Sequence, residues 1–339
     1  MNIHDLLIGT AIGDAFGAGV EFQDREWIRQ QVDFGKLINA RGQIAVPEVQ
    51  KADFTRNYQP WDYTDDTEMT IGLIEALLSG ADFTCELLVS EWEKEYRRGL
   101  AEKGYGRNGH GSMAWYYRGE KSLEAIRAFQ RDRPNPGNAP VMRVVPLGLL
   151  PSHLINAYAQ INAEATHPHP HAIMASQCVA RAAEYMLVQK GEAQGIISYC
   201  RHSVELDRDF THYLQTVEQL PAFPSFSDAD WVCLCGPQPI ESPYFLPGIH
   251  GLPSDAKFTT GCVLLVLKQS RDAFDALKQS IRIGGDVDSV ASICTGIMAG
   301  RYGLQSLPDG MRSKVEGVEK LSELANRFSR FLDAGTSAK

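Results

Sequence analysis

The chain has 339 residues, of which 44% are hydrophobic and 22% charged, and its formal net charge of -9 comes without a Lys- and Arg-rich segment. This composition is typical of a globular protein with a large hydrophobic core, and the charge pattern excludes nucleic acid as an expected partner. Residues 6–22 are too polar to span a membrane, no secretion signal precedes them, and the cysteines are seven, an odd number, so we expect a cytoplasmic protein with reduced thiols.

The first predicted helix covers the apolar residues 6–22. Gly9, Gly13 and Gly17 recur in it every four positions, which allows close approach of another helix backbone. A nucleotide-binding loop is the less favoured explanation, because no strand precedes these glycines and their spacing differs from a dinucleotide fingerprint. Apolar residues at helical spacing then follow in segments 69–78, 123–129, 172–188, 196–206, 263–267, 274–281 and 290–297.

Alternating strand patterns of useful length are absent, so the sequence predicts an all-α protein. Residues 221–257 are the main exception to the helical pattern. Their many prolines and glycines predict a long ordered loop over the surface or the mouth of a site. No low-complexity linker divides the chain, and we therefore expect a single helical domain over residues 1–335 with a tail at residues 336–339.

Two acidic clusters lie far apart in the sequence, Thr64-Asp65-Asp66-Thr67 and Asp286-Val287-Asp288-Ser289. Each places two carboxylates and at least one hydroxyl directly before an apolar helical segment. If the fold brings the two helix starts together, four carboxylates converge. Two like charges about 4 Å apart repel by about 4 kcal/mol at an effective dielectric of about 20. Such a cluster requires cations, and two divalent metal ions would neutralise it.

Helix capping is the alternative explanation of these residues. Thr64 or Asp65 would cap a helix, with Glu68 completing a capping box. Capping needs only one such residue, however, and each cluster holds two acids. Carboxylates and hydroxyls without His or Cys favour hard ions such as Mg²⁺ or Mn²⁺ over Zn²⁺. Asp14 is interpreted separately, as a buried structural acid that binds backbone amides.

The chain resembles the ADP-ribosylglycohydrolase family, an all-α group that includes ADP-ribosylarginine hydrolases and the dinitrogenase-reductase activating glycohydrolase. The matching segments follow the family's order over nearly the whole chain and are specific when taken together. They are residues 9–15 with 20–22, 63–69, 109–111, 137–138 with 142–143, 166–168 and 284–289. The resemblance implies a compact orthogonal bundle of many helices, with a binuclear metal site at the helix N-termini.

The resemblance also implies a set of metal ligands for two Mg²⁺ or Mn²⁺ ions, with Asp288 as the bridge. The implied ligands are Thr64, Asp65, Asp66, Asp286, Asp288 and Ser289. Where this chain has Ser289 the family usually has Thr, and serine keeps the oxygen ligand. The family usually continues Gly-Asn with Gly-Ala-Ala, whereas this chain has Ala139-Pro140-Val141, so its phosphate loop departs from the family pattern.

Catalytic roles are implied for Glu21 and Asp66, with Glu21 as a general base or water-orienting group. A solvated charge at a helix end is the alternative for Glu21. Substrate contacts with the diphosphate and distal ribose are implied for two glycine-rich loops and a histidine. These residues are Gly109, His110, Gly111, Ser112, Gly137, Asn138 and His167. Trp115, Tyr116 and Tyr117 are expected in a helical core rather than on adenine, and His169 and His171 at a helix start rather than on a metal.

The sequence therefore predicts a metal-dependent hydrolase that removes ADP-ribose from a modified protein side chain, arginine first. O-linked ADP-ribose, on serine or as O-acetyl-ADP-ribose, is an alternative substrate. A non-catalytic ADP-ribose-binding protein is also compatible with the sequence, as is a partner-blocking protein that contacts an ADP-ribosylating toxin or enzyme through residues 221–257. The expected partners are ADP-ribose and an ADP-ribosylated protein, with neither nucleic acid nor a membrane.

Overall fold

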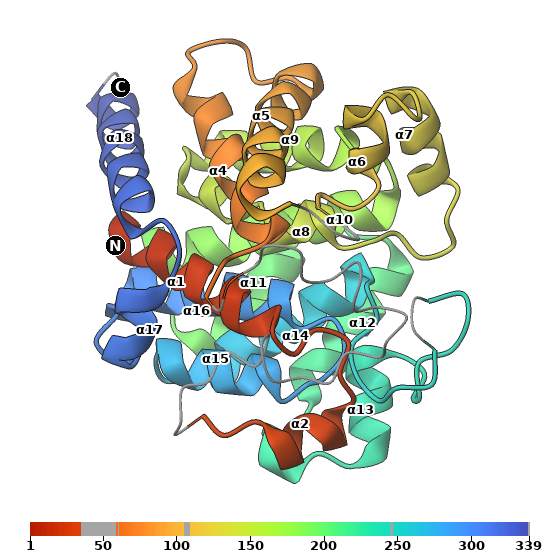
Figure 1. Ribbon diagram of the computed structural model, residues 1–339. Coiled ribbons are helices and arrows are strands. Elements are labelled where there is room, and N and C mark those ends of the chain that lie inside the picture. Colours follow the sequence, from red (N-terminus) through yellow and green to blue (C-terminus); the bar gives the residue numbers. More distant parts are fainter. Residues whose placement is uncertain (35–58, 60, 105–108, 245–246, 338–339) are drawn as a thin grey trace.

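Helices form the regular structure of the computed structural model, which describes residues 1–34, 59, 61–104, 109–244 and 247–337 (Figure 1). Within these ranges there is no strand, and the β-type pairing consists of isolated bridges from Gly285 to Gln23 and Leu252. The prediction of an all-α fold is therefore confirmed. In the same ranges, no helix combines the length and the apolar character that crossing a bilayer requires.

Helices α1 (Ile3–Gly17) and α16 (Asp288–Tyr302) pack side by side along their length (Figure 1). A Cβ on Gly13 would lie 2.2 Å from the carbonyl oxygen of Ala291, and one on Gly17 would lie 2.4 Å from the Cα of Asp288. The two backbones are thus in direct contact, which a larger residue would prevent. The close approach predicted from the glycine spacing is confirmed, and it places the first turn of α16 at the end of α1.

Helix α4 (Asp65–Leu78) contacts both α1 and α16, and it packs along α5 (Cys85–Lys103). Helix α18 (Val318–Ser337) covers α1 and α4 at the edge of the molecule where both termini lie (Figure 1). The pair α9 (Ser152–Glu164) and α10 (Pro170–Ala183) follows, and α10 continues as the π-helical turn η3 (Glu184–Val188). Further elements are α2 (Arg25–Gln31), α6 (Met113–Tyr117), α7 (Leu123–Arg131), α8 (Ala139–Met142), η2 (Val145–Leu149), η4 (Ala193–Gly195), α11 (Ile196–Ser203), α12 (Arg208–Gln219), α14 (Ala256–Gln269), α15 (Ala273–Ile281) and α17 (Asp309–Lys314).

Several of these helices begin with an ordinary side-chain cap. Asp24 caps α2, Thr84 caps α5 and Ser122 caps α7, each accepting a hydrogen bond from a first-turn N–H group. At the two helices that carry the acidic clusters, neither Thr64 before α4 nor Val287 before α16 forms such a bond. Asp65, Asp66 and Asp288 lie inside the first turns rather than at the N-cap position, and Oδ1 of Asp288 accepts the N–H of Ser289 at 2.7 Å.

The prediction of a long irregular segment over residues 221–257 is wrong in its first half. The structure has a 3-10 turn, η5 (Phe223–Ser225), and helix α13 (Asp228–Cys235). The prolines of this segment lie outside α13, and Ser227 with Asp230 forms a complete capping box at its start. Gly236, at φ 81°, then ends the helix.

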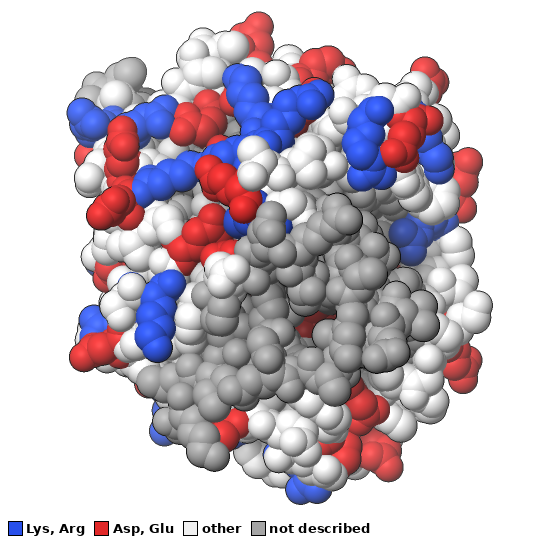
Figure 2. Space-filling model, in the orientation of Figure 1, with Lys and Arg blue, Asp and Glu red and all other residues white. Residues whose placement is uncertain are grey.

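Exposed cations in the middle of α5 pair with acids of the same helix. Lys94 lies 2.6 Å from Glu91, and Arg97 pairs with Glu93. Figure 2 shows basic and acidic side chains interspersed over this part of the surface. On this part of the surface the basic residues of α5 are therefore not gathered into a surface for a polyanion.

Candidate active site

A cavity of about 1020 Å³ opens where α4 and α16 begin. This volume suits a nucleotide-sized ligand. Every residue that the sequence indicated for the site lines it, although the residues come from widely separated stretches of the chain. These residues are Glu21, Thr64, Asp65, Asp66, Gly109, His110, Gly111, Ser112, Gly137, Asn138, His167, Asp286, Asp288 and Ser289.

The two acidic clusters lie close together in this cavity. Carboxylate oxygens of Glu21, Asp286 and Asp288 lie within 4.8 Å of one another. Asp66 lies close enough to Ser289 and Asp286 for both to act on its pKa, which places the first cluster beside the second. The Oδ1 atom of Asp66 is buried and has no hydrogen-bond partner among the described residues. A buried carboxylate oxygen whose lone pairs accept no hydrogen bond from the protein is suited to coordinate a metal ion.

Burial and mutual repulsion dominate the electrostatics of the cluster. Burial, with the charges of Asp14 and Asp65, raises the pKa of Asp66 well above its usual range. Burial also raises the pKa of Asp288, to which Glu21 and Asp66 contribute. The pKa of Asp65 rises to about 8 for the same reasons, burial first and then Asp14. Without added positive charge the cluster would take up protons at neutral pH, and its all-oxygen donor set is of the kind that binds hard divalent cations.

Asp14 holds the start of α4 from the neighbouring helix α1. Its carboxylate accepts hydrogen bonds from the N–H and the hydroxyl of Thr64 at 3.0 and 2.7 Å, and from those of Thr67 at 2.9 and 2.6 Å. The predicted structural role of Asp14 is therefore confirmed. The capping box considered for Thr64 and Glu68 is wrong, because Thr64 donates to Asp14 and Glu68 is engaged elsewhere. Thr64 keeps its oxygen lone pairs for a cation.

Main-chain hydrogen bonds place Glu21 beside the second cluster. The N–H of Phe22 donates to the Gly285 carbonyl at 2.7 Å, and the N–H of Gly285 donates to Gln23 at 2.9 Å. Gly285 has φ 78°, and a Cβ there would lie 2.2 Å from the carbonyl oxygen of Leu252. The glycine pair before Asp286 therefore lets three segments meet at one point, which a side chain would block.

Asn138 connects the loop at residues 136–138 to the acidic cluster. Its side-chain N–H group donates to Asp286 at 3.2 Å and to Ser289 at 3.3 Å, and its side-chain oxygen accepts from the hydroxyl of Ser254 at 3.2 Å. Ser254 carries no signal in the sequence, because it is a single serine in a proline-containing turn. Its role follows from the tertiary contact between residues 252–256 and the loop, seen also in the bond from Ala256 N–H to the Pro136 carbonyl at 2.9 Å.

The loop at residues 109–112 lines the cavity and contains main-chain donors that the described residues leave unused. Among the described residues, the N–H groups of Gly111 and Ser112 have no acceptor, while the Ser112 hydroxyl accepts from Gln130 at 3.0 Å. His110 and Gly111 have φ 57° and 54°, and such successive turns create anion-binding concavities. The side chain of His110 is fully buried, so the residue offers only its main chain to a ligand.

A fully buried arginine, Arg143, supports His167 through Thr166. Arg143 stacks 3.8 Å over the Trp92 ring and donates to Thr166 at 2.8 Å, and Thr166 in turn bonds Nδ1 of His167 at 2.8 Å. Burial, together with the charges of Arg143 and Arg133, lowers the pKa of His167 well below its usual value. The imidazole is therefore neutral at physiological pH. His169 and His171 lie at the start of α10, where His169 caps the helix and His171 bonds Asp207, as predicted.

The aromatic residues of α6 divide between the core and the cavity. Tyr117 is buried, as predicted, whereas Trp115 lines the cavity wall with the half-exposed Phe129. Arg133 lines the same region, and burial lowers its pKa. Neither Phe129 nor Arg133 was indicated by the sequence, because an amphipathic helix and an isolated cation carry no spacing signal for a site.

Comparison with known proteins gives one consistent result. The sequence model of the ADP-ribosylglycohydrolase family matches residues 2–337. The chain is 23% identical to the bovine ADP-ribosylhydrolase ARH3, over 96% of this chain and 91% of that protein, and 24% identical to the human one, over 79% and 78%. An uncharacterised protein of Archaeoglobus fulgidus is 24% identical over 95% and 94%. A solved structure described as an ADP-ribosylglycohydrolase-related protein complex superposes with a TM-score of 0.64 at 19% identity, covering 98% of this chain and 99% of that one.

Proposed function

Because the chain belongs to the ADP-ribosylglycohydrolase family and is a hydrolase, we propose that it cleaves the glycosidic bond between ADP-ribose and a modified protein side chain. One observation carries this proposal. The carboxylate of Glu21 lies within 4.8 Å of Asp286 and Asp288, in the cavity that the glycine-rich loop at residues 109–112 also lines. The cavity thus combines an acidic part, which suits the reacting ribose, with a loop of main-chain donors, which suits a diphosphate.

The metal ligands proposed for two Mg²⁺ or Mn²⁺ ions are the six residues of the acidic clusters. Bound there, the ions would supply the positive charge that keeps these carboxylates ionised and would polarise the hydroxyls of the proximal ribose. The donor set supports this assignment, since it contains carboxylates and hydroxyls and leaves Asp66 Oδ1 without a hydrogen bond among the described residues. The family as a whole is metal-dependent.

Glu21 acts as the general base in the proposed reaction. Its carboxylate accepts a proton from a water molecule, whose oxygen forms the new bond to the anomeric carbon of the ribose. The bond from that carbon to the side-chain nitrogen or oxygen breaks, and the leaving group takes up a proton equivalent to the one that Glu21 accepted, so that the Glu21 carboxylate is regenerated. Asn138 and the neutral His167 orient the ribose and diphosphate, since both line the cavity beside Gly137.

Arginine is the first candidate for the modified side chain, from the resemblance to ADP-ribosylarginine hydrolases. O-linked ADP-ribose is the second, and the similarity to the ARH3 proteins supports it. The decisive assay incubates the purified protein with arginine-linked, serine-linked and O-acetyl ADP-ribose, in Mg²⁺ or Mn²⁺ and in a chelator. We expect metal-dependent release of ADP-ribose from one linkage in preference to the others. Release from none of them would refute the proposal.

Contact with an ADP-ribosylating toxin stays a prediction. Helix α13 and the turn η5 give residues 221–257 more regular structure than the sequence indicated, but nothing in the described contacts identifies a protein partner. Arginine- and serine-modified proteins are therefore the partners to test first.

A further inference from the structure

Glu68 is a buried carboxylate that the proposed chemistry does not use. It follows Asp65 and Asp66 on α4, and its side chain has no exposed surface. Lys103 and His110 lie 3.1 and 3.0 Å from its two oxygens, and Arg98 lies 3.5 Å from Oε1. A buried carboxylate requires such well-placed partners.

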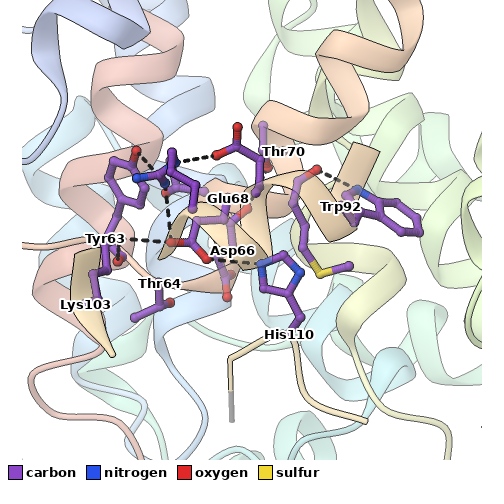
Figure 3. Close-up of polar contacts among 12 residues, drawn as sticks. Tyr63, Thr64, Asp66, Glu68, Thr70, Trp92, Lys103 and His110 are labelled. Carbon is purple, nitrogen blue, oxygen red and sulfur yellow. Dashed lines mark hydrogen bonds and ion pairs between the residues drawn. The ribbon is translucent and has the colours of Figure 1, made fainter. Parts of the chain in front are cut away.

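The two oxygens of Glu68 point to two different segments of the chain. Oε1 accepts a hydrogen bond from Nζ of Lys103 at 3.1 Å, at the end of α5. Oε2 lies 3.0 Å from Nε2 of His110, in the loop at residues 109–112. Figure 3 shows Glu68 between these two side chains, with Thr64 and Asp66 beside it. One carboxylate therefore links α4, α5 and the loop.

Lys103 fixes the residue that directly precedes the first acidic cluster. The ammonium group of Lys103 donates to the Tyr63 carbonyl at 2.8 Å and pairs with Glu316 at 2.7 Å. Glu316 in turn accepts from the N–H of Tyr63 at 3.2 Å. Both main-chain polar groups of the residue directly before Thr64 are therefore held by one ion pair.

The His110 side fixes the loop. The imidazole lies edge-on to Tyr96 and Tyr117, with centroids 5.6 and 5.8 Å apart. The His110 carbonyl accepts from the N–H of Met113 at 3.1 Å and so starts α6. The N–H groups of Gly111 and Ser112, which the loop offers to the cavity, follow His110 directly. Their position is therefore determined by where this imidazole is held.

We propose that Glu68 is a positioning residue that sets the loop at residues 109–112 in register with the acidic segment 64–66. Its bond to His110 holds the loop, and its bond to Lys103 holds the segment, so the two ends of the substrate site are aligned through one side chain. The inference rests on the proposed function where it assigns the loop to a diphosphate. The coupling of loop and segment is a property of the fold and is tested separately.

The first test replaces His110, which leaves Glu68 paired with Lys103. His110→Leu removes the ring N–H, whereas His110→Gln keeps a side-chain N–H group. For His110→Leu we expect KM for the ADP-ribosylated substrate and Kd for ADP-ribose to rise about tenfold or more, because a loop displaced by a fraction of an ångström binds poorly. We expect kcat to change by less than about threefold, since the lost contact acts on binding. His110→Gln should restore most of the affinity, and Mn²⁺ affinity should stay at the wild-type level in both variants.

The second readout is amide hydrogen exchange of residues 109–117 in the ligand-free protein. Faster exchange in His110→Leu than in wild type is expected, and it does not depend on the substrate. Should His110→Leu not fold, His110→Asn serves instead, because asparagine tolerates a positive φ and its shorter amide does not reach Glu68.

Glu184→Gln is the matched control. Glu184 is also a buried carboxylate, paired with Arg181 at 2.7 Å and Tyr199 at 2.8 Å, but it does not line the cavity. This variant should lose stability without a change in KM. If His110→Leu behaves in the same way, with wild-type KM and wild-type exchange at residues 109–117, the network only stabilises the fold and the inference is overturned. If wild type releases no ADP-ribose, the proposed function fails, and the exchange comparison still decides the coupling.

Discussion

Glu21 differs from the other acids of the cavity in how it is held. It follows α1 in a turn that main-chain bonds to Gly285 fix, and it is only partly buried, whereas Asp66, Asp286 and Asp288 are almost completely buried. A partly exposed carboxylate can exchange protons with solvent water, and the buried acids are better suited to hold ions. This difference in burial agrees with the separate roles that the resemblance implied for Glu21 and for the buried acids, and these roles stay predictions.

Replacing Glu21 by Gln tests this division of roles. The amide keeps the size of the side chain but accepts no proton from water, so we expect kcat to fall by about 10²–10⁴-fold. ADP-ribose affinity and Mn²⁺ affinity, measured by calorimetry, should change little. A variant that hydrolyses the substrate at the wild-type rate would remove Glu21 from the mechanism.

Asp66→Asn should affect stability in opposite directions with and without metal. The buried carboxylate has a strongly raised pKa, so its ionised form opposes folding, and a neutral amide removes that opposition. At alkaline pH the metal-free variant should therefore unfold at a higher temperature than metal-free wild type. Added Mn²⁺ should stabilise wild type and have little effect on the variant. Equal stabilisation of both proteins in thermal unfolding would show that Asp66 is no ligand.

At the scale of single residues, the sequence identified those site residues whose type and grouping indicate a particular chemistry. The paired carboxylates, the glycines of residues 109–111 and 137, and the motif histidine that the sequence indicated line the cavity. Ser254, Phe129 and Arg133 could not be found in this way. A serine, an exposed aromatic ring and a single cation occur throughout any chain, and only the tertiary contacts show that these three lie at the site.

At the scale of elements, the contact between α1 and α16 builds the site. The glycine stripe brings the end of α1 against the first turn of α16, and Asp14 on α1 takes over the capping of α4. The stripe was predictable, because a regular spacing of small residues has one common structural use. Helix α13 was not, because the prolines flanking it determined the prediction for the whole of residues 221–257.

Gly13→Ala tests the contact between the two helices. In an isolated helix this change is favourable by about 1 kcal/mol. Here the added Cβ would lie 2.2 Å from the Ala291 carbonyl oxygen, with backbone rather than a flexible side chain in its way. We therefore expect the free energy of unfolding to fall by about 1–3 kcal/mol, the usual cost of overpacking. Urea denaturation measures this loss, and an unchanged or higher stability would contradict the direct backbone contact.

For the molecule as a whole, the sequence predicted the fold class correctly but could not show that the two acidic clusters meet. That meeting depends on three helices and on the bridges at Gly285, none of which is visible in the spacing of residues 64–67 and 286–289. Nearly all buried hydrophobic residues of the described ranges belong to one cluster, which extends from Ile3 to Phe328. The division into a domain at residues 1–335 and a tail stays a prediction, since residues 338–339 lie outside the described ranges.

The acidic cavity makes the stability of the metal-free protein depend on pH. The pKa of Asp65 is about 8 in the folded protein and 3.8 in the unfolded reference, so between these values the folded state binds more protons than the unfolded one. The contribution of the cluster to stability is therefore present at the acidic end of this window and is lost as the pH rises toward 8. Asp66, Asp286 and Asp288 act in the same direction, because burial raises the pKa of each.

Bound divalent ions should reverse this dependence, because they bind the ionised carboxylates and displace protons. At a free metal concentration of about 100 times Kd the gain is about 2.7 kcal/mol. We thus expect the stabilisation by Mn²⁺, the difference between urea denaturation with metal and with chelator, to grow from the acidic to the alkaline end of the window. Asp288→Asn is the control and should show little metal effect at any pH. A metal effect in wild type that does not change with pH would mean that the ions bind away from these carboxylates.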